Sequence, residues 1–416
     1  MNHGITAAVI FVLVYAVILA GESSPRKLDR PAAGLIGAVL MVLTGVLTRH
    51  DAIEAIDFST IALLLGIMFV VHHASASGLL EALARKLVDL SHGPFQLLWT
   101  VGFSSGILSA LFVNDTICLL MTPLLLALVR RAKLPAEPYL LCLATSSNVG
   151  SAMTITGNPQ NMLIGQASGF TWSGFALLMA PIALVCLALN VLIVASMYRK
   201  DLSGKVIAVG HTVAIHELNK KLAVKTLVVL LGLLIAFLLG APMDLSAMTA
   251  AAVILVLANV PPAESFAGID WALLMFFAGL FVVVAGVSKS EIGLLSHFLP
   301  AVLNDTNSLQ GLLQFSAVSV IGSNLFGNVP FVMLMRDWVS HAQHAHLLWL
   351  LLAVSSTFAG NLTLVGSVAN LIVAQGAKDE CPLSFWSFLR TGVITTLVTS
   401  LVAVTVLYGY HLLKWI

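Results

Sequence analysis

Long apolar segments alternate with short polar ones along the whole chain. The apolar runs approach the 17–25 residues that an α-helix needs to cross the hydrocarbon core of a bilayer. Clear examples are 5–19, 32–47, 175–197 and 226–239. Because lipid offers no hydrogen-bond partner to an open backbone, these runs must form helices. The pattern therefore predicts an all-α polytopic membrane protein, and we read the first run as a retained helix rather than a cleaved signal.

The composition agrees with this class. Of 416 residues, 59% are hydrophobic and only 9% are charged, whereas a soluble domain carries about 25% charged residues. The formal net charge of +1 gives no reason to expect a nucleic-acid partner. The cysteines lack paired CxxC spacing, so we expect neither a disulfide framework nor a zinc site. They are Cys118, Cys142, Cys186 and Cys381.

The chain also repeats itself. Three motifs return in the same order about 210 residues later, which indicates an internal duplication. They centre on Asp57 and Asp270, on Asn114 and Asn328, and on the segments 154–161 and 363–370. The longest polar stretch lies between the two copies. We therefore predict an N-terminal transmembrane repeat at 1–200, a cytoplasmic linker at 201–223 and a C-terminal transmembrane repeat at 224–416.

Each repeat is predicted to hold five crossing helices and one re-entrant hairpin. Because five is odd, the second repeat must be inverted relative to the first. With both termini outside, about sixteen Lys and Arg residues fall in the cytoplasm and about four outside, as the positive-inside rule requires. The hairpins are expected at 97–131 and 308–340, with limbs shorter than a full span. The crossings are expected at 4–20, 32–48, 58–77, 138–166, 174–197, 224–240, 244–260, 270–288, 346–375 and 386–412.

Four of these predicted segments are interrupted by Gly, Pro and polar residues. They are the hairpin tips 113–116 and 327–330 and the broken helices 147–161 and 359–370. In inverted-repeat transporters, discontinuous helices of this kind meet at the membrane midplane and bind substrate and ions. Their unpaired backbone groups cannot remain unsatisfied in lipid, so we expect them to line a solvated cavity. Half-helix N-termini suit an anion, and carbonyl, Asn and Thr oxygens suit a small cation.

The candidate substrate- and ion-binding residues share these interruptions, and Asn dominates because it both donates and accepts hydrogen bonds. Asn114 and Asn328 are also the candidate ligands should the coupling ion be Na⁺. We predict no catalytic residues, no metal cofactor and no other cofactor. The candidates are Asn114, Asp115, Thr116, Ser147, Asn148, Gly150, Thr156, Gly157, Asn158, Asn161, Asn328, Pro330, Asn361, Thr363, Gly366, Ser367 and Asn370.

A few charged residues near these segments have competing interpretations. Asp115 is the only acidic residue at any of the tips, and carboxylates inside a membrane are usually functional. It could bind a cation, carry a proton or cap the returning limb of its hairpin. Asp57 and Asp270 begin predicted spans, where helix N-capping is the better interpretation. Arg336 and Asp337 are neighbours that could pair with each other.

The histidines favour structural interpretations. His72 and His73 lie towards the end of an apolar span, and we expect interfacial polar residues there rather than a proton relay. A second group resembles a metal cluster but falls in an exposed connection, so we expect no metal site in it. That group is His341, His344 and His346.

The interruptions resemble those of the ion-transporter superfamily. This superfamily joins arsenite permeases, NhaD-type sodium/proton antiporters, the pigmentation P protein and citrate/dicarboxylate transporters. Residues 111–115 with 121–123 look like the first hairpin of arsenite permeases, and 328–330 looks like their second. Residues 147–150 and 156–161 are similar to the corresponding P-protein motifs. The tips match the Ser-Asn-Thr signature of the dicarboxylate branch only partly, and Asn158 stands where the P-type motif has Asp.

The resemblance implies a multi-pass secondary active transporter in the plasma membrane (the bacterial inner membrane), with a homodimer as the expected assembly. Because no Lys or Arg lies in any interruption, we expect a small inorganic or organic anion or a neutral oxyacid such as arsenous acid. Coupling would be to H⁺ or Na⁺, with Asp115 as the candidate coupling residue. The alternatives are an NhaD-type Na⁺/H⁺ antiporter and a dicarboxylate/citrate-type anion transporter. The chain has no HExxH, GxSxG or Walker motif, so we do not expect an enzyme.

Overall fold

The computed structural model describes residues 3–20, 29–88, 91, 93–203, 218–289 and 306–416. Every regular element among these residues is a helix, which confirms the predicted all-α class. The first half contains α1 (His3–Ala20), α2 (Arg30–Leu43), α3 (Arg49–Glu54), α4 (Phe58–Ala76), α5 (Leu79–Val88), α6 (Pro94–Phe112), α7 (Asn114–Arg131), α8 (Glu137–Ser151), η2 (Ile155–Gly157), α9 (Pro159–Ser168) and α10 (Trp172–Met197).

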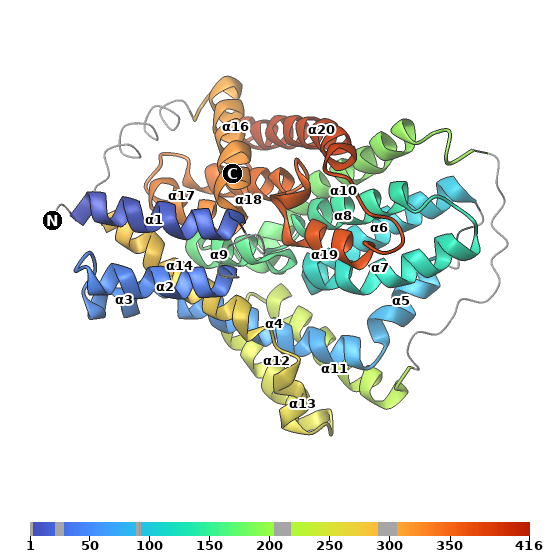
Figure 1. Ribbon diagram of the computed structural model, residues 1–416, viewed down its shortest axis with the longest axis horizontal. Coiled ribbons are helices and arrows are strands. Elements are labelled where there is room, and N and C mark those ends of the chain that lie inside the picture. Colours follow the sequence, from blue (N-terminus) through green and yellow to red (C-terminus); the bar gives the residue numbers. More distant parts are fainter. Residues whose placement is uncertain (1–2, 21–28, 89–90, 92, 204–217, 290–305) are drawn as a thin grey trace.

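Among the described residues, the second half follows the order of the first, except that the place of α5 falls at 290–305, outside the described residues (Figure 1). It contains α11 (Lys220–Leu238), α12 (Met243–Leu257), α13 (Pro262–Ala267), α14 (Trp271–Lys289), α16 (Leu309–Phe326), α17 (Asn328–Ser340), α18 (Ala345–Ala359), η3 (Leu364–Gly366), α19 (Val368–Gly376) and α20 (Phe385–Leu412). Part of the predicted linker, 204–217, lies outside the described residues. The exact repeat boundaries therefore stay a prediction.

Seven of the described helices are long and apolar enough to cross a bilayer: α4, α6, α10, α11, α14, α16 and α20. Two expectations about length were wrong. The hairpin limbs α6 and α16 are 19 and 18 residues long, about 27 Å at 1.5 Å per residue, which approaches a full span. The helix expected at 32–48 ends at Leu43, because Gly45 takes a left-handed backbone (φ +74°) that stops it.

Polar residues set several helix starts. Asp57 accepts a hydrogen bond from the Thr60 amide at 3.0 Å, and Asp270 accepts one from the Leu273 amide at 2.9 Å. Both are N-caps that satisfy an otherwise unpaired donor in the first turn. The predicted capping roles of these two aspartates are confirmed.

The helices pack into two groups, each drawn from both halves. The α2–α14 group contains α1–α4 and α11–α14, and the site group contains α6–α10 and α16–α20. The pairs are reciprocal: α2 packs on α14 and α4 on α12, while α7 packs on α19 and α9 on α17. Such exchange of partners is expected of two repeats related by a two-fold axis. The inversion of one repeat across the membrane stays a prediction.

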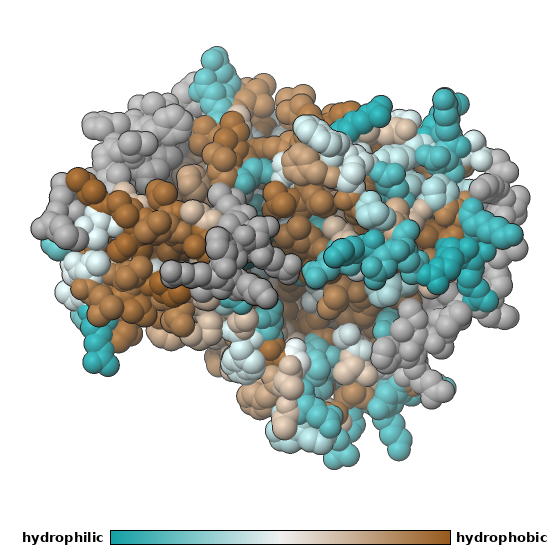
Figure 2. All heavy atoms as spheres, in the orientation of Figure 1, coloured by the Kyte–Doolittle hydropathy of each residue, from teal (hydrophilic) through white to brown (hydrophobic). Residues whose placement is uncertain are grey.

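Small residues allow the close approach inside the α2–α14 group. A Cβ atom on Gly66 would lie 2.5 Å from the Ala247 backbone, and one on Gly279 would lie 2.5 Å from the Gly34 backbone. Glycine at these crossings lets helix backbones touch, as is typical of membrane helix pairs. Figure 2 shows apolar surface over α1 and α2, where Val12 and Leu43 are exposed. This surface suits contact with lipid rather than water.

Candidate functional site

Three of the four predicted interruptions, the first hairpin tip and both broken helices, meet at Asn148 inside the site group. Its Nδ2 donates to Oδ1 of Asn361 and of Asn370, both at 2.9 Å. Its Oδ1 accepts from Asn114 Nδ2 at 3.1 Å and from Ser367 Oγ at 3.0 Å. One amide therefore joins the first hairpin tip to both broken helices. These five side chains, joined by hydrogen bonds that span up to 222 residues in sequence, form one buried cluster.

Each broken helix is closed by an asparagine of its own repeat. Asn161 and Asn370 both donate Nδ2 to the two carbonyls that lie ten and seven residues before them. The distances are 3.3 and 3.1 Å in the first repeat and 2.7 and 3.0 Å in the second. Carbonyls at the C-terminal end of a helix lack an intrahelical donor. The two asparagines supply donors at the same place in each repeat, so that the chain can unwind within the bundle.

A second, smaller cluster surrounds Thr357 near the end of α18. Its Oγ1 accepts from Asn158 Nδ2 at 3.3 Å and from Gln160 Nε2 at 3.4 Å. Asn158 also donates to Ser151 Oγ at 2.8 Å and caps α9 by accepting from the Asn161 amide at 2.9 Å. Neither Thr357 nor Gln160 was among the predicted site residues, although Gln160 lies inside the broken helix predicted at 147–161 and Thr357 lies two residues before the one at 359–370.

The other predicted site residues take positions around these clusters. Ser147 Oγ donates to the Asn114 carbonyl at 3.2 Å and so holds the first hairpin tip. Thr156 Oγ1 accepts from Trp172 Nε1 at 3.1 Å, and Thr363 Oγ1 donates to Asn324 Oδ1 at 3.2 Å. Asp115 and Thr116 lie in the first turn of α7, as Asn328 and Pro330 do in α17.

The glycines among the predicted site residues serve close packing in this structure. A Cβ atom on Gly150 would lie 2.2 Å from the Gly106 backbone, and one on Gly157 would lie 2.1 Å from the Ser151 carbonyl oxygen. A Cβ on Gly366 would lie 2.9 Å from Asn324 Oδ1. These positions leave no room for any larger residue without a shift of backbone or amide.

The site is closed here, in contrast to the solvated cavity that the sequence predicted. Asn148 is 2% exposed, and the first interruption is buried throughout η2. The amides satisfy one another because burying an unpaired polar group is costly. The second interruption is more open, since Val365 in η3 is 59% exposed.

Three predicted site residues nevertheless have a buried side-chain atom without a hydrogen-bond partner. They are Asn114, Asn161 and Asn328, and in each case the atom is the amide oxygen Oδ1. Among the described residues of the predicted site, every buried side-chain N or O atom without a hydrogen-bond partner is thus an acceptor. Such atoms favour a ligand that donates hydrogen bonds or carries positive charge.

The α2–α14 group brings charge towards Asp115. Arg30 of α2 and Asp270, the N-cap residue of α14, act electrostatically on this carboxyl group. The sequence showed no basic residue in the interruptions and gave no means to place Arg30 towards one. The two charges act in opposite senses, because a cation favours the ionised carboxylate and a second carboxylate disfavours it.

One ion pair joins the second hairpin to the α2–α14 group. Arg336 Nη1 lies 3.1 Å from Asp57 Oδ2, with the two side chains 39% and 11% exposed. Arg336 thus pairs with Asp57 and not with its neighbour Asp337, because consecutive helical residues point in different directions and do not face each other.

His73 is buried inside the protein, at 1% exposure, which the span pattern did not predict. Its Nδ1 lies 2.8 Å from the Phe69 carbonyl oxygen, and its Nε2 lies 3.1 Å from Ser265 Oγ of α13. Both ring nitrogens have partners, and His73 links α4 to α13. Side-chain packing between the halves, which the span pattern does not encode, decides this burial.

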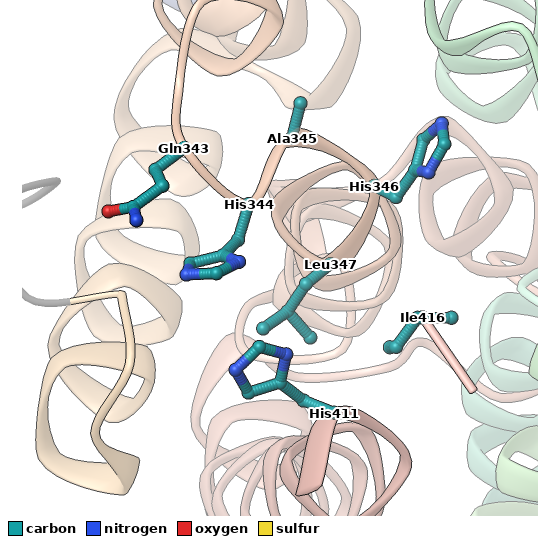
Figure 3. Close-up of a pocket in the computed structure, with 7 residues that line it drawn as sticks. All are labelled: Gln343, His344, Ala345, His346, Leu347, His411 and Ile416. Atoms are coloured by element: carbon teal, nitrogen blue, oxygen red, sulfur yellow. The ribbon is translucent and has the colours of Figure 1, made fainter. Parts of the chain in front are cut away.

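Of the three histidines that resemble a metal cluster, His344 and His346 lie at the N-terminus of α18, and His341 is the C-cap of α17. The rings of His344 and His411 meet with centroids 4.8 Å apart, while His346 packs on Phe170 at 5.0 Å. Figure 3 shows His346 pointing away from the other two rings. Among the described residues, no three His, Cys, Asp or Glu side chains gather as metal ligands.

Comparisons with known proteins agree with this architecture. Residues 12–355 match the family described as "CitMHS: Citrate transporter". The chain is 32% identical to the silicon efflux transporter LSI3 of Oryza sativa subsp. japonica, over 91% of this chain and 92% of that protein. It is 24% identical to the putative transporter arsB of Dictyostelium discoideum, over 96% and 91% of the two chains. The YdaH transporter of Alcanivorax borkumensis shares the fold, with a TM-score of 0.60, 16% identity and coverage of 100% and 99%.

Proposed function

Because this chain belongs to the CitMHS citrate transporter family, we propose that it is a secondary active transporter of a small oxyacid. It is a multi-pass membrane transporter of the CitMHS and arsB type and not an enzyme. The cargo that fits the site best is a neutral, hydroxyl-bearing acid such as arsenous or silicic acid. We further propose export across the plasma membrane, with a homodimer as the assembly.

The observation that supports this cargo is the set of unpaired amide oxygens on Asn114, Asn161 and Asn328. A neutral oxyacid presents several O–H donors to such acceptors, whereas a fully ionised carboxylate presents none. Leaving a buried acceptor unsatisfied costs about 1–3 kcal/mol, so a donor-rich cargo recovers free energy that an anion does not. Relatives named for silicon efflux and arsB fit the same chemistry.

Coupling is assigned to Asp115 in this proposal, through H⁺ or Na⁺. It is the acidic residue in the first turn of α7, next to the Asn114 tip that contacts Asn148. Protonation or cation binding at this carboxyl group would change the charge beside the cluster during each cycle. The charged residues Arg30 and Asp270 would set the balance between the two states.

A second candidate is sodium/proton antiport without cargo. The buried oxygens of Asn114 and Asn328 favour it, because hard cations prefer oxygen ligands, amide carbonyl oxygens among them. A third branch, citrate or dicarboxylate transport, has the family description in its favour. The experiment below separates the three.

The test is flux in proteoliposomes that contain the purified protein. An imposed pH or sodium gradient should drive the flux of arsenite or silicic acid, and the rate should saturate with cargo concentration. Citrate should not compete with this flux. In Asp115→Asn the gradient should no longer drive the flux, although exchange down the cargo gradient should continue. Proton movement on adding sodium without cargo would instead establish the antiporter, and saturable citrate flux the carboxylate transporter.

A further inference from the structure

A fully buried asparagine lies behind the site, outside every predicted interruption. Asn190 of α10 is 0% exposed. Its Nδ2 donates to Thr145 Oγ1 at 2.9 Å and to Ser146 Oγ at 2.8 Å, both in α8. Its Oδ1 accepts from Thr395 Oγ1 of α20 at 3.1 Å. One amide thus connects α8, α10 and α20 in the interior of the site group.

The α8 end of this connection leads directly to the site. Thr145 and Ser146 immediately precede Ser147 and Asn148, which hold the first hairpin tip and the central cluster. The Thr145 carbonyl also accepts from Asn361 Nδ2 at 3.3 Å. A shift of this turn would move both partners of the Asn148–Asn361 contact.

The α20 end leads to the second interruption. Thr396, next to Thr395, donates to the Phe358 carbonyl at the end of α18 at 3.3 Å. A Cβ atom on Gly392 would lie 2.1 Å from the Asn361 carbonyl oxygen, so α20 packs directly on the second break. Asn190 is therefore bonded on one side to the first broken helix and on the other to the helix that supports the second.

The second repeat has no equivalent of this residue. Counted from the N-caps Thr171 and Ser384, the position of Asn190 falls on Ala403 in α20, which is buried and apolar. A symmetrical packing requirement would place the same residue type at both positions. The single amide fits a connection that crosses between the repeats rather than a feature of each helix.

We propose that Asn190 is a positioning residue for the site, which keeps the two broken helices in register so that Asn148 and Asn361 stay in contact at 2.9 Å. The effect on cargo affinity rests on the proposed function, whereas the positioning of the two broken helices does not. Binding groups displaced by about 1 Å can lose activity by orders of magnitude, so a buried hydrogen-bond network one layer behind them affects affinity.

The test compares Asn190→Leu, close in volume but without hydrogen-bonding atoms, with Ser316→Ala. Ser316 is a matched control because it is 3% exposed and bonds Ser355 at 2.8 Å, which joins α16 to α18 without linking the two breaks. Hydrogen exchange by mass spectrometry on the full-length protein should show faster exchange in both 145–151 and 358–362 for Asn190→Leu. The control should leave 145–151 unchanged.

Arsenite flux provides the second measurement. Asn190→Leu should raise KM about tenfold and change Vmax less than KM, whereas Ser316→Ala should leave KM near wild type. The milder variant Asn190→Ser should also speed hydrogen exchange and raise KM, by smaller amounts than Asn190→Leu. It is measured in place of Asn190→Leu if that variant does not fold. Unchanged exchange in either segment, or an equal loss in the control, would overturn the inference. Altered exchange in a protein that moves no oxyacid would refute the proposed function and leave the positioning role intact.

Discussion

The two half-sites are built on one plan and filled with different chemistry. In the first, Ser367 Oγ donates to Asn148 Oδ1 at 3.0 Å. In the second, the repeat-equivalent residues meet again, as Asn158 Nδ2 donates to Thr357 Oγ1 at 3.3 Å. The acceptor is an amide oxygen in the first contact and a hydroxyl oxygen in the second. The two contacts therefore share their place in the fold and differ in the group that accepts the hydrogen bond.

The consequence is an unequal distribution of hydrogen-bonding capacity. Asn148 uses both of its polar atoms, with two donated and two accepted bonds. Unpaired buried oxygens occur in both repeats, on Asn114 and Asn161 in the first and on Asn328 in the second, but exposure differs: η3 is partly exposed where η2 is buried. We infer that the fully bonded Asn148 cluster is the fixed part of the site and that the more exposed η3 side is the part where a ligand can add contacts.

The largest effect is expected from removing the central amide, that of Asn148. Asn148→Leu should lower oxyacid flux by about a hundredfold or more, because it leaves the oxygens of Asn361 and Asn370 buried without donors and each such loss costs about 1–3 kcal/mol. Initial rates in proteoliposomes measure the effect, with folding checked by size-exclusion chromatography. Flux within threefold of wild type would show that the cluster is not part of the site.

A smaller effect is expected from the second centre. Thr357→Val keeps the shape and removes one acceptor, so the amides of Asn158 and Gln160 each lose a long contact of 3.3 or 3.4 Å. We expect a three- to tenfold rise in KM, on the order of 1 kcal/mol. Thr357→Asn should retain more activity than Thr357→Val, since an amide can again accept. A loss of flux in Thr357→Val as large as that in Asn148→Leu would contradict the division of the site into a fixed and an adaptable part.

The smallest effect is expected at the ion pair between the second hairpin and α4. Arg336→Gln should lower the thermal stability of the detergent-solubilised protein only slightly, because a partly exposed pair contributes about 0–1 kcal/mol and salt screens it. Asp57→Asn keeps a capping side chain and isolates the loss of charge. Thermal unfolding at low and high salt measures both variants. A strong effect that does not depend on salt would mean that this contact does more than pair two charges.

Much of the architecture could be predicted from the sequence, because its causes are local. Apolar run length and the cost of open backbone in lipid determine that the chain forms membrane helices. Gly, Pro and Asn at fixed spacing mark the broken helices predicted at 147–161 and 359–370, and the α-helix is interrupted within them at 152–158 and 360–367. The N-caps Asp57 and Asp270 follow from the same short-range rules. The family resemblance, seen in the same motifs, is confirmed by the match over 12–355.

Only the tertiary structure decided which of these polar residues meet. Sequence placed Asn148 and Asn370 in separate breaks, but their contact at 2.9 Å spans 222 residues and depends on how α8 and α19 pack. Arg30 near Asp115, the pairing of Arg336 with Asp57, and Asn190 behind the site were beyond local patterns for the same reason. The periodicity of the sequence reveals on which face of its own helix a side chain lies. Which residue it contacts is determined by the packing of another helix against that face.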